Sequence, residues 1–129
     1  MPTYGYDHIH LRSPDPMKTA QWYHRMLDAT IVETPQPSGP NRVDLDINGL
    51  MVFIAGALPT GQELRAPRDP HYGLDHFGLR VESLEETVAE LRRRGAEFAV
   101  EPRTLPSGVK IAFVRAPDNV RVEIVQRPI

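Results

Sequence analysis

Cysteine is absent from the 129-residue sequence, which excludes disulfide bonds and thiolate metal sites. Any metal site in this chain must therefore use histidine and carboxylate side chains. The sequence also has no apolar run long enough to cross a bilayer, and its first residues lack the apolar segment of a secretory signal peptide. We therefore expect a cytoplasmic protein without a membrane partner.

The chain has no strong excess of charge of either sign, since its formal net charge is −2. This balance does not favour nucleic acid or a membrane surface as a partner. The one basic cluster, Arg92-Arg93-Arg94, falls at the end of an expected helix, where the helix dipole favours cations. With 40% hydrophobic residues, the composition predicts one globular domain over residues 1–129.

One six-residue sequence occurs twice in related forms. Residues 7–12 read Asp-His-Ile-His-Leu-Arg and residues 75–80 read Asp-His-Phe-Gly-Leu-Arg, just over half the chain further on. A repeat on this scale indicates two copies of one supersecondary unit. We predict a first module over about residues 5–56, a linker rich in proline, glycine and charge over about 57–72, and a second module over about 73–127.

Hydrophobic periodicity and turn residues predict the same order of elements in both modules: a strand, a helix and three more strands. The first module is expected to have a strand over 5–12, a helix over 16–27 capped by Asp15, a strand over 30–34 and a hairpin over 42–55 around Asn48-Gly49. The second is expected to have a strand over 74–81, a helix from Ser83 to Gly95, a short strand over 98–100 and hairpin strands over 109–115 and 120–126.

Alternation within the strands separates an aliphatic face from a polar face. In the first hairpin the aliphatic face is a core face, and the other face mixes Asp44 and Asp46 with Met51 and Phe53, as a ligand cavity does. We predict an α+β fold in which two tandem βαβββ modules form curved mixed sheets, or half-barrels, with helices on the convex face. The concave face is expected to carry His8, His10, Asp44, Asp46, His76, Arg80 and Glu123.

Three motifs resemble those of the vicinal oxygen chelate superfamily, which includes glyoxalase I, methylmalonyl-CoA epimerase, extradiol dioxygenases and bleomycin or fosfomycin resistance proteins. They are residues 8–15, residues 75–81 and residues 117–124, and the resemblance covers essentially the whole chain. It implies a divalent metal on the concave face, with His8, His76 and Glu123 as ligands by motif position. It also implies a homodimer, and leaves open whether one chain or two complete each site.

The first module departs from the glyoxalase pattern. Glyoxalase I and the epimerase usually place a fourth ligand on the last strand of the first module, where the hairpin register puts Phe53. Two histidines and one carboxylate with open positions are typical of non-haem Fe(II) oxygenases. The resemblance therefore favours Fe(II), with Mn, Zn, Ni or Co as alternatives. Asp44 or Asp46 remains an alternative fourth ligand.

We therefore predict a metal-dependent enzyme whose small-molecule substrate chelates the ion through two adjacent oxygens. The favoured reaction is extradiol dioxygenase cleavage of a catechol-like ring. One alternative is a glyoxalase-like lyase or an epimerase, with Glu123 as the base that abstracts a proton next to a carbonyl. Another is a drug-binding resistance protein that uses the same cleft without metal.

The remaining candidates are side chains expected on the concave face. His10 is predicted to be a base beside the metal ligands or to donate a hydrogen bond to bound oxygen, or else to be a plain wall residue. The predicted substrate contacts are Phe53, Met51, Asp44, Arg80 and Arg121. The two arginines suit a substrate carboxylate, although pairing with Asp44 or Asp46 is an alternative. Whether His71 and Tyr72 in the linker reach the site is left open.

Overall fold

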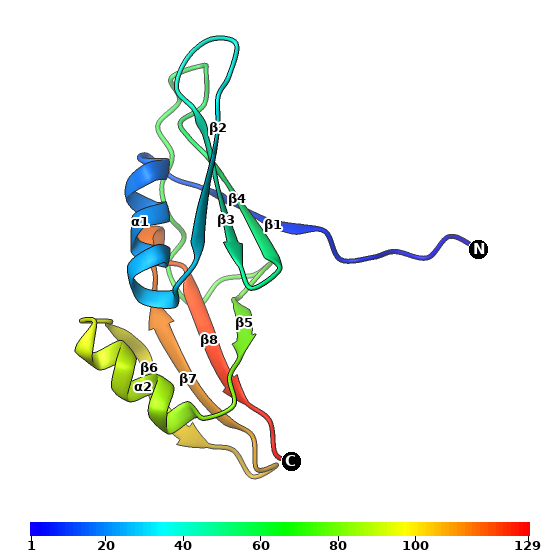
Figure 1. The fold of residues 1–129 in the computed structure, drawn as a ribbon, viewed down its shortest axis with the longest axis vertical. Helices are drawn as coiled ribbons and strands as arrows, with labels where there is room; N and C mark the ends of the chain where they lie inside the picture. Colours follow the sequence, from blue (N-terminus) through cyan, green and yellow to red (C-terminus); the bar gives the residue numbers. More distant parts are fainter. The chain divides into compact units, whose positions relative to one another are not determined.

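The protein was analysed as a computed structural model that describes all residues from 1 to 129. The chain divides into two compact units, Met1–Leu64 and Arg65–Ile129. Each unit has one helix and one open four-stranded sheet (Figure 1). The order of elements is the same in both units, namely a strand, a helix and three strands. The predicted α+β fold with two tandem βαβββ modules is therefore confirmed.

The first unit contains β1 (His8–Arg12), α1 (Pro16–Leu27), β2 (Thr30–Thr34), β3 (Arg42–Ile47) and β4 (Leu50–Ala55). Its sheet has the order β1-β4-β3-β2, in which β1 is parallel to β4 and the other pairs are antiparallel. The helix begins as predicted. Asp15 accepts a hydrogen bond from the backbone N–H of Lys18, and Pro16 occupies the first helical turn.

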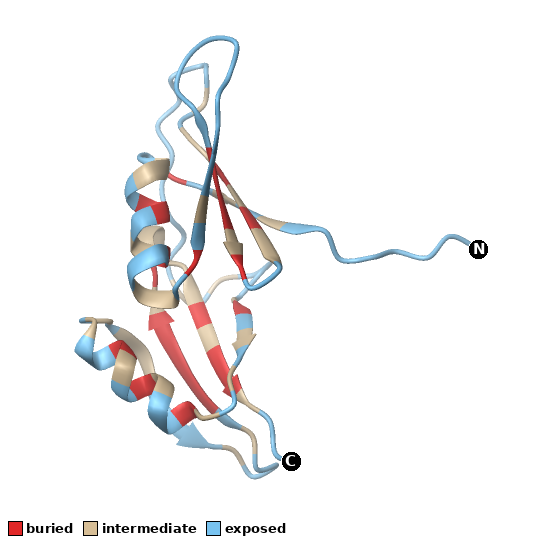
Figure 2. Ribbon diagram, viewed as in Figure 1, coloured by how far each residue is buried: buried red, intermediate tan, exposed pale blue.

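The hairpin between β3 and β4 has the predicted register, which pairs Leu45 with Val52. Asn48 and Gly49 both have positive φ angles, of 50° and 96°, as a two-residue hairpin turn of type I′ requires. Leu45, Val52 and the two helix residues Ala20 and Tyr23 are fully buried. Figure 2 shows the buried residues of α1 on the side that faces its own sheet. The aliphatic face is therefore the core face.

The second unit contains β5 (Phe77–Arg80), α2 (Leu84–Arg93), β6 (Phe98–Thr104), β7 (Lys110–Arg115) and β8 (Arg121–Gln126), with a single 3-10 turn at Pro117–Asn119. Its sheet has the order β5-β8-β7-β6, with β5 parallel to β8. The repeat in the sequence thus corresponds to a repeat in strand pairing.

Three strand boundaries differ from the prediction by more than one residue. The strand expected over residues 5–12 begins at His8. The first strand of the second module was expected to begin at Leu74, but β5 begins at Phe77, so that His76 lies just before it. The strand expected to end at Val100 extends to Thr104 and contains two register shifts against β7. Pro102 does not end this strand because β6 is an edge strand, where a missing N–H donor is tolerated.

Strand β7 is buried on both faces. On one face, Ala112 and Val114 join the core beneath α2, whose buried residues are Leu84, Val88 and Leu91. On the other face, Ile111 and Phe113 form a second apolar cluster with Val125, against which residues of β6 and the following loop pack. The face opposite α2 is thus partly apolar, which matters for the candidate site.

Part of the predicted linker over residues 57–72 belongs to the second unit. The side-chain amide of Asn119 donates a hydrogen bond to the carbonyl of Pro67, at 2.7 Å. The guanidinium of Arg115 lies 2.6 Å from the carboxylate of Asp69. These contacts fix residues 65–72 against the β7–β8 end of the second sheet.

Neither helix in the structure has the length and apolar character that a membrane span needs.

The start of α2 gives a test of local stability. The hydroxyl of Ser83 accepts a hydrogen bond from the backbone N–H of Glu86, at 3.2 Å. Ser83→Ala removes this cap and is expected to lower the free energy of unfolding by about 1 kcal/mol. Urea denaturation measures the change. Ser38→Ala, in an exposed loop, is the control, and an equal loss in both variants would contradict a capping role for Ser83.

Candidate metal centre

His76 and Glu123 come together because β5 and β8 are parallel neighbours. Gly78, two residues after His76, pairs with Glu123 across the two strands. The Nε2 atom of His76 lies 3.3 Å from Oε1 of Glu123. A Cβ atom at Gly78 would lie 3.4 Å from the same oxygen, at van der Waals contact, so the carboxylate lies over this glycine. The second unit therefore holds a histidine and a glutamate at the spacing of a ligand pair.

The other nitrogen of His76 is engaged by Asp75. Nδ1 of His76 lies 2.6 Å from Oδ2 of Asp75. The hydrogen bond with His76, together with the positive charge of Arg121, holds the pKa of Asp75 below its ordinary value against an opposing effect of desolvation. An ionised carboxylate only accepts hydrogen bonds, so Nδ1 carries a proton, and in the neutral imidazole the lone pair lies on Nε2. The neutral form of the ring thus presents its unprotonated nitrogen to Glu123.

Arg121 contacts two carboxylates of its own unit. One of its terminal nitrogens bonds to Asp75, and its Nε lies 3.6 Å from Oδ2 of Asp69. The guanidinium also lies over the ring of Phe113, 5.1 Å from the centroid. The sequence analysis offered a substrate carboxylate or Asp44 or Asp46 as its partner. Its partners within the second unit are Asp75, the first residue of the repeated sequence, and Asp69 in the predicted linker.

In the first unit, the residue at the position of Glu123 is Phe53. His10 pairs with Phe53 across β1 and β4, as Gly78 pairs with Glu123 across β5 and β8. The ring of Phe53 stacks on His8, with centroids 4.2 Å apart. Nδ1 of His8 lies 2.5 Å from the carboxylate of Asp7, which repeats the contact between His76 and Asp75. The first unit thus has the histidine and its aspartate, with a stacked ring at the position equivalent to Glu123.

Asp44 and Asp46, the alternative fourth ligands, are both bonded within the first unit. The buried carboxylate of Asp44 accepts a hydrogen bond from Nε of Arg42 at 2.7 Å, and a longer one from the N–H of Ile54. Asp46 accepts one from the backbone N–H of Gly49, at 2.7 Å, in the hairpin turn. These contacts give each aspartate a structural role.

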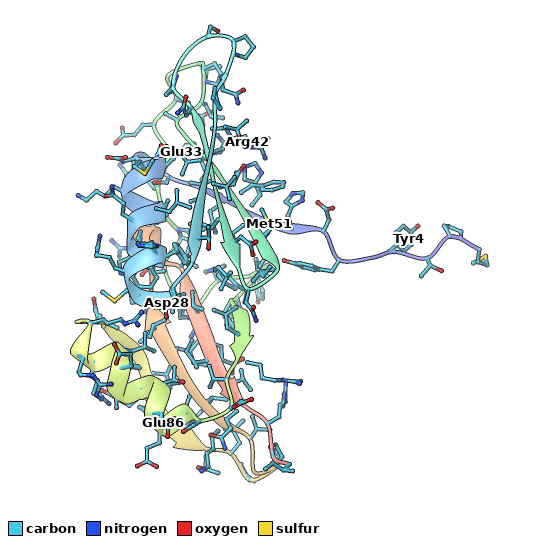
Figure 3. All side chains as sticks on the ribbon, in the orientation of Figure 1. Tyr4, Asp28, Glu33, Arg42, Met51 and Glu86 are labelled. Carbon is cyan, nitrogen blue, oxygen red and sulfur yellow. The ribbon has the colours of Figure 1, made fainter.

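Two other candidate residues lie in the first unit. His10 is exposed, and its ring centroid lies 6.3 Å from that of His8. Met51 pairs with His8 and projects from β4 on the side away from α1 (Figure 3).

In the second unit, Arg80 is exposed at the end of β5. His71 bonds through Nδ1 to the carbonyl of Tyr72, whose own side chain is fully exposed.

Within neither unit do three or more histidine and carboxylate side chains form a group able to hold a metal ion. The structure brings together His76 and Glu123, and His8 belongs to the other unit. The participation of His8 as the third ligand stays a prediction.

Two residues of the candidate site were missed by the sequence analysis. Phe113 lies edge-on to His76, with centroids 4.7 Å apart, and forms an apolar wall beside the ligand pair. Phe113 pairs directly with Glu123 across β7 and β8, so the two side chains share one face of the sheet. The alternation of β7 relative to β8 could therefore have indicated Phe113. Asp75 was already visible as the repeated aspartate before each histidine, and its role follows from that position.

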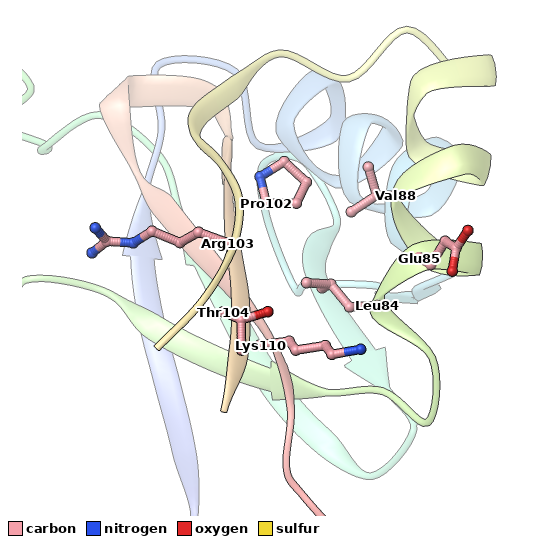
Figure 4. A pocket seen from close by; sticks show the side chains of 7 residues that line it. All are labelled: Leu84, Glu85, Val88, Pro102, Arg103, Thr104 and Lys110. Atoms are coloured by element: carbon pink, nitrogen blue, oxygen red, sulfur yellow. The ribbon is translucent and has the colours of Figure 1, made fainter. Parts of the chain in front are cut away.

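A pocket of about 270 Å³ lies elsewhere in the second unit, between α2 and the strands β6 and β7. Figure 4 shows its apolar side chains from the helix and its cationic side chains from the strands. The residues that line it are Leu84, Glu85, Val88, Pro102, Arg103, Thr104 and Lys110. None of the predicted site residues is among them, so this pocket is separate from the candidate metal centre.

Comparison with known proteins gives three kinds of match. A family model described as "Glyoxalase/Bleomycin resistance protein/Dioxygenase superfamily" matches residues 5–124. The chain is 32% identical over 124 residues to the uncharacterized protein YwkD of Bacillus subtilis, a match that covers 93% of this chain and 94% of that protein. It is 34% identical over 55 residues to a probable lactoylglutathione lyase of Synechocystis sp., a match that covers 42% of each chain.

The fold matches that of solved structures. One is the glyoxylase/bleomycin resistance protein/dioxygenase domain from Frankia sp. EAN1pec, with a TM-score of 0.77 and 23% identity. The match covers 98% of this chain and 94% of that one. At this level of identity, the likeness supports the fold.

Proposed function

Because the chain belongs to the glyoxalase, bleomycin resistance protein and dioxygenase superfamily, we propose that it is an enzyme that binds one divalent metal ion through His76, Glu123 and His8. The observation that carries the proposal is the pair formed by His76 and Glu123. Both side chains are partly accessible, with 31% and 20% of their surfaces exposed, so an ion can reach them.

The spacing of this pair suits a metal. Two ligand atoms that each lie about 2.1 Å from one ion are separated by about 3.0 Å in octahedral and about 3.4 Å in tetrahedral geometry. The distance of 3.3 Å between Nε2 of His76 and Oε1 of Glu123 falls within this range. The neutral imidazole and the carboxylate suit first-row metals such as Fe(II), Mn, Zn, Ni and Co. Asp75, bonded to Nδ1, acts as the supporting carboxylate that ligating histidines usually have.

His8 is the proposed third ligand because its surroundings repeat those of His76. Its Nδ1 is bonded to Asp7, which leaves Nε2 with the lone pair. It also occupies the position equivalent to His76 in the strand pairing of its sheet. We further propose that the protein is a homodimer, and that His8 of the same chain or of a second copy completes the ligand set.

With such a ligand set, the bound ion supplies Lewis-acid stabilisation of negative charge on two adjacent substrate oxygens. The residues of the chain do the rest. Glu123 and the two histidines would hold the ion and the substrate would bring its two oxygens to it. His10, next to His8 on the same face, accepts a proton from a substrate hydroxyl. Phe53 and Met51 supply apolar contact for a planar ring, and Arg80 supplies an exposed cation.

The favoured reaction is cleavage of a catechol-like ring by dioxygen. The reason is Phe53, which stands in the strand pairing where the second unit has Glu123. A ring at this position provides no fourth ligand, and two histidines with one carboxylate are the set used by non-haem Fe(II) oxygenases.

A lyase or isomerase is the second candidate, and the match to the Synechocystis lyase favours it. In this reaction Glu123 abstracts a proton next to a substrate carbonyl. The enediolate that results is stabilised electrostatically in the site.

Metal analysis of protein purified without oxygen tests the proposal. We expect about one iron ion per chain in the wild type and loss of the iron in His76→Ala. Oxygen uptake with a panel of catechols is expected only in the wild type. A cleavage product formed with consumption of dioxygen identifies the reaction.

The other outcomes separate the alternatives. Zinc, nickel or cobalt in the wild type, with no oxygen uptake, would favour the lyase or isomerase. No metal in the wild type, even after reconstitution with each of these ions, would overturn both enzyme proposals and leave a metal-free drug-binding protein.

A further inference from the structure

We propose that Arg121 is a positioning residue for His76: it holds the carboxylate of Asp75 against Nδ1 and thereby directs Nε2 toward Glu123. The sequence suggested a substrate contact for this arginine, but its contacts in the structure point to a role inside the protein. The inference concerns the orientation of the imidazole, and only its consequence for metal affinity rests on the proposed function.

Asp75 alone has little to hold it in place. Its side chain is 45% exposed and lies in the segment before β5, outside any strand. An exposed carboxylate exchanges freely between partners and water, so a single bond to His76 does not fix either group. Arg121 supplies the missing constraint, because it bonds to the same Oδ2 atom that contacts Nδ1 of His76.

Arg121 is itself well fixed. Its side chain is only 18% exposed, and it lies on β8, a strand with a neighbour on each side in the sheet. Its Nε lies 3.6 Å from Asp69, and its guanidinium lies over the ring of Phe113. Asp69 is in turn bonded to Arg115, at 2.6 Å. The guanidinium is therefore held in place by its neighbours, and its bond to Asp75 restricts the position of that carboxylate.

The first unit provides an internal comparison. His8 has its aspartate, Asp7, but the residue at the position of Arg121 is Met51, which has no donor to offer. The side chain of Asp7 is accordingly 84% exposed, against 45% for Asp75. The same histidine–aspartate pair thus occurs once with a supporting arginine and once without it, and the supported copy is the one beside Glu123.

The two carboxylates on Arg121 also argue against a role in binding a substrate anion. Asp69 and Asp75 balance the positive charges of Arg121 and of Arg115, which also pairs with Asp69. A substrate carboxylate at this place would have to displace one of them. Displacing Asp75 would release His76.

The test uses the 129-residue chain without metal, with ¹⁵N-labelled histidine, at a pH where the imidazoles are neutral. Nitrogen chemical shifts report which ring nitrogen carries the proton. In the wild type we expect His76 to be mainly protonated on Nδ1. In Arg121→Met, which copies the residue of the first unit, we expect a clear shift toward the other tautomer, and no change at His8.

Two further variants complete the design. Arg115→Met removes an arginine that contacts Asp69 but not Asp75, so the tautomer of His76 should stay as in the wild type. Arg121→Lys keeps one cationic donor and should restore part of the wild-type signal. Affinity for Mn²⁺ or Co²⁺, measured in parallel, should fall about tenfold in Arg121→Met and recover in part in Arg121→Lys.

An unchanged tautomer and unchanged metal affinity in Arg121→Met would overturn the positioning role, while metal binding by the wild type would still support the proposed function. An equal change in Arg115→Met would also overturn it, because the effect would then come from loosening residues 65–72. If the wild type binds no metal, the proposed function fails, and the nitrogen shifts alone still decide whether Arg121 orients His76.

Discussion

Glu123→Gln is expected to lower the affinity of the protein for Mn²⁺ or Co²⁺ by about a hundredfold or more. Glutamine has nearly the same shape, so the space opposite Gly78 stays filled. The charge of the carboxylate is lost, however, and a neutral amide oxygen is a much weaker ligand than a carboxylate for these ions. Supporting residues around a metal account for about ten- to a hundredfold in affinity, so a direct ligand should account for at least the upper end of that range. Calorimetric titration measures the change.

Glu101→Gln is the matched control for this experiment. Glu101 lies on β6, is exposed, and pairs with Arg92 at 2.8 Å. Its loss should leave the metal affinity unchanged, and the thermal unfolding midpoints of both variants should stay close to that of the wild type. Wild-type affinity in Glu123→Gln would mean that the pair formed by His76 and Glu123 is not the metal site.

Phe53→His is expected to raise the affinity for the same ions by about tenfold or more and to abolish oxygen uptake with catechols. The strand pairing places this position in the first unit where Glu123 stands in the second, next to His8. An imidazole there would add a fourth ligand to the proposed set, and the oxygen-dependent reaction is associated with a set of three. Histidine is preferable to glutamate, because Asp44 lies directly across on β3 and like charges on facing residues are destabilising.

Phe53→Leu separates the added ligand from the loss of the ring. It removes the stacking on His8 and the contact with the guanidinium of Arg42, 4.6 Å from the ring centroid, but it adds no ligand. Its metal affinity should match that of the wild type. A higher metal affinity in both variants, or in neither of them, would contradict the equivalence of Phe53 and Glu123 in the site.

The sequence was sufficient to predict the fold because its strongest signals are local and are repeated. The turn at Asn48-Gly49 determines the register of the first hairpin, and the alternation on either side of it identifies the core face. The caps at Asp15 and Ser83 locate the helix starts. The repeated histidine strand then implies that both modules have the same order of elements.

The boundaries that were predicted incorrectly depend on neighbours that are distant in the sequence. β6 continues past Pro102 because it lies at the edge of its sheet, and the local sequence does not indicate which strand is at the edge. β5 begins late because only the part of this segment beside β8 has a partner for its backbone. The strand propensity of the local sequence does not show which strand lies at the edge of a sheet or where its pairing partner begins.

The candidate site was predicted in part. The sequence repeat indicated His76, and the closeness of Glu123 follows from strand parity once β5 and β8 are known to be parallel. The network around Arg121 was not predicted, because its partners Asp69 and Asp75 lie 46 or more residues away in a segment without regular secondary structure. Contacts between a strand residue and such a segment form through tertiary packing, which the local sequence pattern does not indicate.

The shared strand register of the two units has a consequence for how the protein can diverge. The backbone ladders of β1 with β4 and of β5 with β8 are made by main-chain groups, so they do not depend on which side chains stand at Phe53, Met51, Arg121 or Glu123. Substitution at these positions can therefore change the chemistry of one half while the other half and the fold are preserved. A duplicated unit of this kind lets new activities evolve from single replacements in one copy.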